Sequence, residues 1–400
     1  MIIKNIRLTE ENETLKLSAD CKIRKIGFDT IYFTFDKKFA SFLYPDASPF
    51  AAALFIPCMK EGEDLIIHGS ISEKLYSGMQ KIMDIMITWN TGLKKIRIIP
   101  DAISEDENEP HAIASFFSGG VDSFHTYLKN KHSSDEKITH FILVNGYDID
   151  LRNKKLWEAT LQDVMKTADH EGILVIAVES NIKRLNEPII QWTQNFGGCL
   201  AAIGLALRKE IKTVYIASSF TKDRQIPSGS HLATDFLWST ETIQFIHDGA
   251  ECTRFEKIQN EIATSDVALN HLRVCYKNYK AKFNCGKCDK CLRTMIALKI
   301  CGSLEKASTF PHQISMDLIH ALSIEDEVTA SFHTENLEQL QKLKIEEELQ
   351  QVLIEKLRHK MHNHSAPETL ARIIYIDHMY NRGRIFSMIS DAKALFKYKK

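Results

Sequence analysis

Several features that would assign this protein to a membrane or secreted class are missing from its sequence. No run of about 18 apolar residues, the length that crosses a bilayer, occurs in the 400 residues. The opening residues, MIIKNIRLTEENETLKL, lack the apolar core of a signal peptide. Nine cysteines are too few for a disulfide scaffold. We therefore expect a soluble, cytoplasmic protein that makes no contact with membranes.

An excess of either charge is also missing. The 51 Lys and Arg residues nearly cancel the 52 Asp and Glu residues. A global basic field, which would favour nucleic acid as the main partner, is therefore absent. The length exceeds that of one usual domain and predicts two or three.

Composition divides the chain into three predicted parts. The N-terminal part has short β-rich runs at 30–35 and 65–68 and a helical stretch at 72–87, which predict a mixed α+β domain. An acidic, Pro-containing segment at 104–110 has no apolar residue and is predicted to be a linker. The last part is helical and charged, and it ends in a basic tail at 397–400. The predicted domains are therefore 1–108, 109–302 and 303–400.

The central part alternates between strands and helices. Strand then helix in alternation predicts an α/β fold with a parallel sheet and helices on both faces, a layout common among nucleotide-binding proteins. The apolar, β-branched runs are 112–117, 140–144, 173–178 and 213–217, and the clearest helical stretches between them are 151–170 and 196–209.

The first of these strands leads directly into the hexapeptide SGGVDS, residues 118–123, and then into a helical stretch. Adjacent glycines let backbone N–H groups approach an anion, Ser118 and Ser123 add hydroxyl donors, and the helix N-terminus adds partial positive charge. Asp122 would orient the loop or contact a magnesium ion bound to the phosphates. An ordinary strand-to-helix turn is the alternative, which six matched residues in this context disfavour. The loop lacks GxxxxGK[ST], so transfer of a γ-phosphate is not expected.

SGGVDS after an apolar strand resembles the motif of the PP-loop ATP pyrophosphatases. The resemblance implies a Rossmann-type core of the PP-loop kind, ATP and Mg²⁺ as cofactors, and cleavage of ATP between its α- and β-phosphates. It also implies an adenylated acceptor that a nucleophile then attacks. Its loop roles fall on Ser118, Gly119, Gly120, Val121, Asp122 and Ser123, with Ser118, Asp122 and Ser123 as the catalytic candidates.

Four cysteines fall within 17 residues, in the string CYKNYKAKFNCGKCDKC. Four thiolates satisfy a tetrahedral zinc ion and leave no open position, so Zn²⁺ bound here would be structural. A chance cluster of buried thiols and a redox or persulfide role are the alternatives. The predicted zinc ligands are Cys275, Cys285, Cys288 and Cys291.

SGGVDS and CGKCDKCLRT in one chain resemble 7-cyano-7-deazaguanine synthase over residues 112–301. The resemblance implies adenylation of a carboxylate or amide, followed by attack of ammonia or an amine. Added regions at both ends suggest a bulky partner, so the acceptor would be a deazaguanine-type molecule, a peptide or a protein. A tRNA-thiolating sulfurtransferase of the PP-loop type and a non-catalytic nucleotide-sensing module remain as alternatives, although the near-neutral charge argues against an RNA partner.

Polar residues beyond the strands are the candidate substrate shell, because ligands of parallel sheets bind beyond the carboxyl ends of the strands. For any one of them, a surface or loop-forming role is an open alternative, and His231 and Asp235 could simply share a helix face. Cys199 and Cys252 are interpreted as packed thiols. The nucleotide candidates are Asn145, Ser218 and Ser219. The candidates for the acceptor or its phosphates are Asp148, Ser230, His231, Asp235, Arg254 and Lys257.

Overall fold

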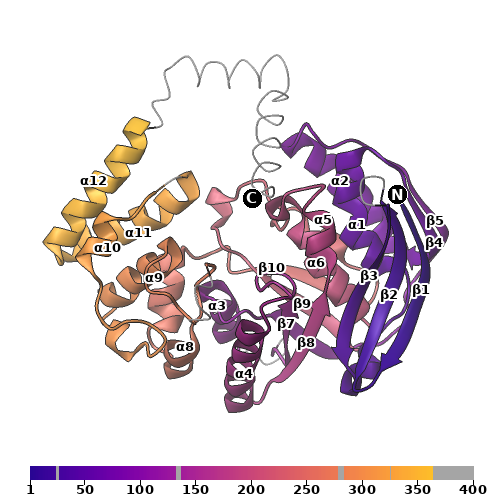
Figure 1. Cartoon of the computed structure of the whole chain (residues 1–400), viewed down its shortest axis with the longest axis horizontal. Helices are drawn as coiled ribbons and strands as arrows, with labels where there is room; N and C mark the ends of the chain where they lie inside the picture. The colour runs from indigo at the N-terminus through magenta and orange to yellow at the C-terminus, as the bar shows by residue number, and fades with distance from the viewer. Residues whose placement is uncertain (24–26, 132–136, 278–282, 325, 364–400) are drawn as a thin grey trace.

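A single ten-stranded sheet runs through the described residues of the computed structural model, in the order β10-β9-β6-β7-β8-β3-β2-β1-β4-β5 (Figure 1). The structure describes residues 1–23, 27–131, 137–277, 283–324 and 326–363, so the basic tail at 397–400 lies outside them. The fold is α/β, as predicted, and most of the strand pairs are parallel.

Five parallel strands form the half of the sheet that carries the SGGVDS loop. The four predicted strands form where the apolar runs lie. A fifth, β10, was not predicted, because its apolar residues stand inside a long polar segment at the sheet edge. The strands are β6 (Ala112–Phe116), β7 (His140–Asn145), β8 (Leu174–Ser180), β9 (Ile211–Ala217) and β10 (Gln244–Asp248).

Helices cover both faces of this half, because successive side chains of a strand point to opposite faces. In β7, Ile142 enters one core with α6, while Phe141 and Leu143 enter the other with α3. In β9, Val214 and Tyr215 divide in the same way. The helices of these two layers are α5 (Ile182–Asn186) and α6 (Trp192–Ala206) on one face, and α3 (Val121–Asn130) and α4 (Lys154–Glu171) on the other.

The N-terminal strands continue the same sheet. β3 pairs antiparallel with β8, with Phe33 opposite Ser180. The predicted 1–108 part thus shares its sheet and one apolar core with residues of the central part. Its elements are β1 (Ile2–Glu11), β2 (Thr14–Ile23), β3 (Gly27–Asp36), the 3-10 helix η1 (Lys37–Phe42), α1 (Ser48–Glu61), β4 (Leu65–Ser72), α2 (Glu73–Trp89) and β5 (Ile98–Ser104).

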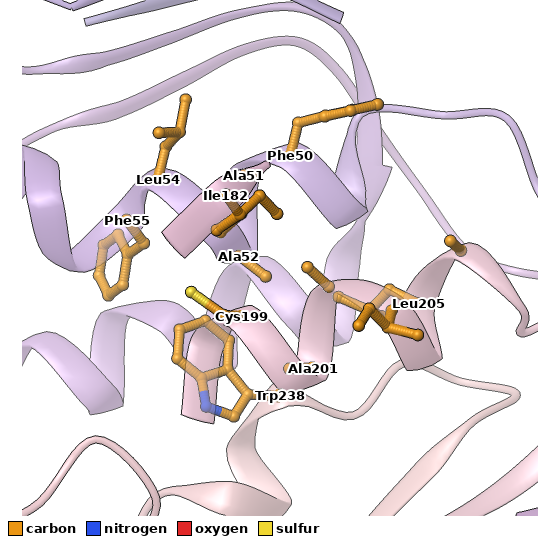
Figure 2. Packing of buried hydrophobic residues seen from close by; sticks show 14 of the residues in the cluster. Phe50, Ala51, Ala52, Leu54, Phe55, Ile182, Cys199, Ala201, Leu205 and Trp238 are labelled. Carbon is orange, nitrogen blue, oxygen red and sulfur yellow. The ribbon is translucent and has the colours of Figure 1, made fainter. Parts of the chain in front are cut away.

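The most extensive contact between the two parts joins α1 to α6. Figure 2 shows Phe50, Leu54 and Phe55 of α1 above Cys199 and Leu205 of α6. Small residues permit this approach: a Cβ atom added to Gly198 would lie 2.7 Å from the carbonyl oxygen of Ala52. A glycine here therefore sets the distance between the helices.

The segment predicted as a linker connects β5 to β6 without regular structure, and it is tied to the fold by a buried ion pair. The fully buried Arg208 guanidinium contacts Asp106 of this segment, with Nε 2.7 Å from Oδ2. The same guanidinium contacts Asp46, with Nη2 2.6 Å from Oδ2. One arginine thus holds the connecting segment against the region before α1.

Helices dominate the chain after β10, as predicted for its last part, and in Figure 1 they lie at the opposite end of the molecule from β1 and β5. No helix among the described residues has both the length and the apolar character of a bilayer span. The helices after β10 are α7 (Arg254–Lys257), the π-helix η4 (Ile258–Ile262), α8 (Asp266–His271), α9 (Asp289–Ile300), the 3-10 helix η6 (Leu304–Lys306), α10 (Met316–His320), α11 (Glu327–Leu343) and α12 (Glu347–Asn363). Two 3-10 helices, η2 (Lys222–Arg224) and η3 (Asp235–Trp238), lie between β9 and β10.

Candidate functional site

The SGGVDS loop places the N-terminus of α3 at the carboxyl end of β6. Gly119 has φ +72°, a left-handed conformation that favours glycine, and its carbonyl accepts the N–H of Arg273 at 2.7 Å. Gly120 precedes α3 and supplies no side-chain cap, so the first-turn N–H groups remain available to an anion. The Ser123 hydroxyl donates to the Gly120 carbonyl at 3.1 Å and holds the turn from inside.

Asp122 lies in this first turn and is held by two cations. Its Oδ2 is 2.9 Å from Arg254 Nη1 and its Oδ1 is 3.2 Å from Lys257 Nζ, while the Ser219 hydroxyl donates to Oδ2 at 3.1 Å. The Lys257 side chain is fully buried and also donates to the carbonyl of Ser218. Burial raises the pKa of Asp122, but Lys257 and Arg254 together outweigh that effect and hold the pKa well below its usual range. The carboxylate is therefore ionised.

Two more cations from α9 act on the same region. Burial lowers the pKa of Lys290, and the nearby Arg254 lowers it further. Arg293 is affected in the same way, with its pKa lowered to about 10 by burial and then by Arg254. Like charges that lower each other's pKa repel one another, and Asp122 together with Asp289, whose Oδ2 is 3.3 Å from Arg293 Nη1, offsets part of this repulsion. An anion bound among these side chains would offset more of it.

α11 closes one side of the cluster through Phe332 and Glu335. The guanidinium of Arg293 lies 4.1 Å from the centre of the Phe332 ring, and that of Arg254 lies 5.7 Å from it. Glu335 Oε1 is 3.3 Å from Arg224 Nη1, and its Oε2 accepts the N–H of Phe255. A small space remains between these elements. It is lined by Arg254, Phe255, Ile258, Arg293, Ala297, Phe332, Glu335 and Asn336.

The four cysteines predicted to bind zinc converge in one buried cluster, with every pair of sulfur atoms within 4.8 Å. Cys285 Sγ is 3.8 Å from Cys291 Sγ, and Cys288 Sγ is 3.9 Å from Cys275 Sγ. Sulfurs about 2.3 Å from a tetrahedral ion stand roughly 3.8 Å apart, and these two distances match that spacing, so this cluster could bind a metal ion such as zinc. The N–H of Cys288 donates to Cys285 Sγ at 3.2 Å, which stabilises a thiolate there.

The cysteine cluster is physically joined to the SGGVDS loop. Asn284 accepts N–H groups of Val274 and Cys275 through its Oδ1, and it donates to the Leu272 carbonyl through its Nδ2. These bonds fix the short segment whose Arg273 N–H binds Gly119. α9 starts directly after Cys288, so the same cluster also positions Lys290 and Arg293. A metal at the cysteines would therefore help to hold the SGGVDS loop, Lys290 and Arg293 in place.

Of the candidate residues predicted after the strands, some lie beside the cationic cluster and others lie away from it. Ser219 contacts Asp122, and the Ser218 carbonyl contacts Lys257, so both border the cationic cluster. Asp148 is exposed and acts electrostatically on Arg273 and Lys290. Asn145 is buried and donates to Glu179 at 3.1 Å.

Ser230, His231 and Asp235 form a separate cluster around one buried carboxylate. Asp235 is fully buried and accepts the Ser230 hydroxyl at 2.6 Å and the N–H of His231 at 3.1 Å. His247 of β10 also contacts this carboxylate, with its Nδ1 2.8 Å from Oδ2. The His231 ring lies 4.5 Å from the Trp89 ring of α2. The contacts of Asp235 thus fix this segment to β10. His231 and Asp235 do not share a helix face, because the 3-10 helix η3 begins only at Asp235.

Sequence reasoning missed the basic residues near the cysteines. Arg273 stands two positions before Cys275, and Lys290 and Arg293 flank Cys291. Their proximity to a predicted metal site was the available signal. Arg254 and Lys257 were assigned to phosphates, and the structure brings both to Asp122.

Comparison of the chain with models of protein families, with curated proteins and with solved structures found no match. The geometry of the site must therefore carry the functional argument.

Proposed function

We propose that this protein is an ATP-dependent, AMP-forming ligase of the PP-loop ATP pyrophosphatase type. The observation that carries the proposal is Asp122, which stands in the open first turn of α3 between Arg254 and the fully buried Lys257. Buried lysine and arginine are costly unless an anion compensates them, and strongly shifted pKa values gather at functional sites.

The arrangement suits the pyrophosphate part of ATP. The N–H groups of the loop and the first turn of α3 would bind phosphate oxygens, and Arg254, Lys290 and Arg293 would bind the charge that develops on the departing pyrophosphate. Mg²⁺, which would neutralise phosphate charge when bound with ATP, has Asp122 as the nearest carboxylate in the loop. Asp122 would then exchange part of its contact with the two cations for contact with the ion.

The reaction would transfer AMP to an acceptor. A carboxylate or amide oxygen of the acceptor attacks the α-phosphorus, the bond to the β-phosphate oxygen breaks, and pyrophosphate leaves. Ammonia or an amine then attacks the activated carbonyl and displaces AMP. The acceptor would be a deazaguanine-type molecule, a peptide or a protein. The short distances among the four cysteine sulfurs favour a structural metal over a persulfide-forming pair, and hence a ligase over a sulfur-transfer enzyme.

The nucleotide products test this proposal. The enzyme is incubated with Mg-ATP and fractionated small-molecule and peptide pools, and the nucleotides are separated by chromatography. AMP and pyrophosphate should form in equal amounts, and Asp122→Asn should abolish them. The exposed Asp150, which pairs with Arg152 at the surface, offers a matched control, and Asp150→Asn should keep full turnover. Accumulation of ADP in proportion to acceptor consumed, or full turnover by Asp122→Asn, would refute the proposal.

A further inference from the structure

His125, one turn along α3 from Asp122, is buried without the hydrogen bonds that a buried imidazole normally makes. His125 is only 2% exposed, and both of its ring nitrogens lack a hydrogen-bond partner within the described residues. Buried polar atoms are almost always paired, so an unpaired ring points to a ligand that would complete it.

Two further metal-ligating side chains face this ring from the loop after β10. His125 Nε2 is 3.8 Å from Glu251 Oε1, and the Cys252 sulfur lies within 4.8 Å of a ligand atom of each. A nitrogen and an oxygen bound to one zinc ion at about 2.1 Å stand roughly 3.4 Å apart in tetrahedral geometry. His125 and Glu251 would therefore need to approach by a few tenths of an ångström, and the Cys252 sulfur would close on the same ion. Nitrogen, oxygen and sulfur together form a donor set suited to zinc.

We infer that His125, Glu251 and Cys252 form a second zinc site, distinct from the four-cysteine cluster. Three protein ligands leave one coordination position, and this position faces solvent because Glu251 is exposed and Cys252 is half-buried.

Neighbouring charges make this site weaker than the cysteine cluster. Lys129 Nζ is 2.5 Å from Glu251 Oε1 and 2.6 Å from Asp248 Oδ1. A zinc ion would displace this ammonium from Glu251, while Lys129 would keep Asp248. Lys257 adds a second positive charge near the ring. The second zinc should therefore be removable by a chelator under conditions in which the buried cysteine cluster keeps its metal.

Zinc titration of the full chain tests the inference. Protein is dialysed against a mild chelator until one equivalent of zinc remains and is then titrated with zinc alone. The wild type should bind one further equivalent. Cys252→Ser and Glu251→Gln, which change partly exposed side chains and should not disturb folding, should each weaken that step at least tenfold. Cys301→Ser, at another half-buried cysteine, is the matched control and should leave it unchanged.

Cadmium NMR separates the two sites by their ligands. The cadmium-loaded wild type should give one resonance typical of four sulfurs and a second typical of a mixed nitrogen, oxygen and sulfur set. Only the second resonance should vanish in Cys252→Ser. Lys129→Met should raise the affinity of the second site for the metal, because the competing ammonium is removed. A wild type that takes up no further zinc, or a Cys252→Ser variant that binds the second equivalent as tightly, would overturn the inference.

Discussion

The two ends of the sheet bury different chemistry. At the β1–β5 end, twelve of the fourteen residues of α1 are buried, nearly all of them apolar, against an α6 that is rich in alanine and glycine. At the β9–β10 end, the buried side chains include Arg254, Lys257 and Arg293, beside the four cysteines. The first end is held mainly by apolar packing, with one buried arginine, Arg208, paired to two carboxylates, whereas the second gathers several buried cations.

Within one continuous sheet, the apolar end thus contributes mainly to stability, and the charged end carries the proposed function. Apolar burial stabilises a fold without help from a ligand, whereas buried like charges repel one another until an anion joins them. The charged end also depends on the cysteine cluster to hold Arg273 and α9 in place. We therefore expect perturbations of the two ends to have different consequences.

The largest effect should follow from removal of one metal ligand. Cys291→Ser should abolish binding of zinc at the four-cysteine cluster and destabilise the protein by more than about 3 kcal/mol, because structural zinc binding is coupled to folding. Metal analysis and thermal melting measure both effects. Hydrogen exchange should accelerate in α9 and around Gly119 while α1 remains protected. Equal acceleration in α1 would break the distinction between the two ends.

The next largest effect should follow from loss of the Asp122 carboxylate. Asp122→Ala leaves the fully buried Lys257 without that partner, and breaking a buried pair in this way costs about 3–5 kcal/mol. Urea unfolding checks this cost. Adding Lys257→Met should recover part of the loss, because the uncompensated charge is then gone. An Asp122→Ala protein as stable as the wild type would show that the carboxylate does not compensate the positive charge of Lys257 and Arg254.

The contact between the N-terminal part and the central strands should respond to acid. His140 of β7 packs against Phe39 and Phe42, and burial lowers its pKa from 6.5 to about 4. The unfolded chain therefore binds a proton first as the pH falls, so stability is lost between pH 6.5 and about 4. This loss should reach about 3 kcal/mol. His140→Phe should flatten the curve of unfolding free energy against pH in this range, and an unchanged curve would count against the assignment.

The smallest effect is expected at the apolar end. Gly198→Ala places a Cβ atom 2.7 Å from the Ala52 carbonyl and 3.3 Å from the Trp238 ring, so α1 and α6 must separate. Overpacking of this kind costs about 1–3 kcal/mol. Thermal melting should show the loss, while zinc content and nucleotide binding stay at wild-type levels. A loss of zinc would mean that the two ends are coupled more tightly than their contacts suggest.

The parallel strands and the SGGVDS loop were predictable because each rests on local patterns, apolar β-branched runs and glycine-rich spacing. β10 was not, because its apolar residues are few and its pairing with β9 is non-local. The pairing of β3 with β8, which joins the N-terminal strands to the central sheet, is also non-local, and no local pattern encodes it.

The candidate site shows the same limit. The cysteine spacing predicted a cluster that the structure confirms as a possible metal site. The cations around Asp122 come from α7 and α9, which are separated by more than thirty residues, and only the fold reveals that they share one region. The His247–Asp235 pair was hidden for the same reason, since β10 brings it together.

The most direct test of the account is the effect of pyrophosphate on thermal stability. If the buried cations serve an anion, then Mg-pyrophosphate at about 100 times its dissociation constant should stabilise the wild type by about 2.7 kcal/mol. Arg254→Met should lose most of this stabilisation, while Arg97→Met, at an exposed ion pair of the N-terminal region, should retain it. The absence of a shift in the wild type, or an equal shift in Arg254→Met, would contradict the central claim.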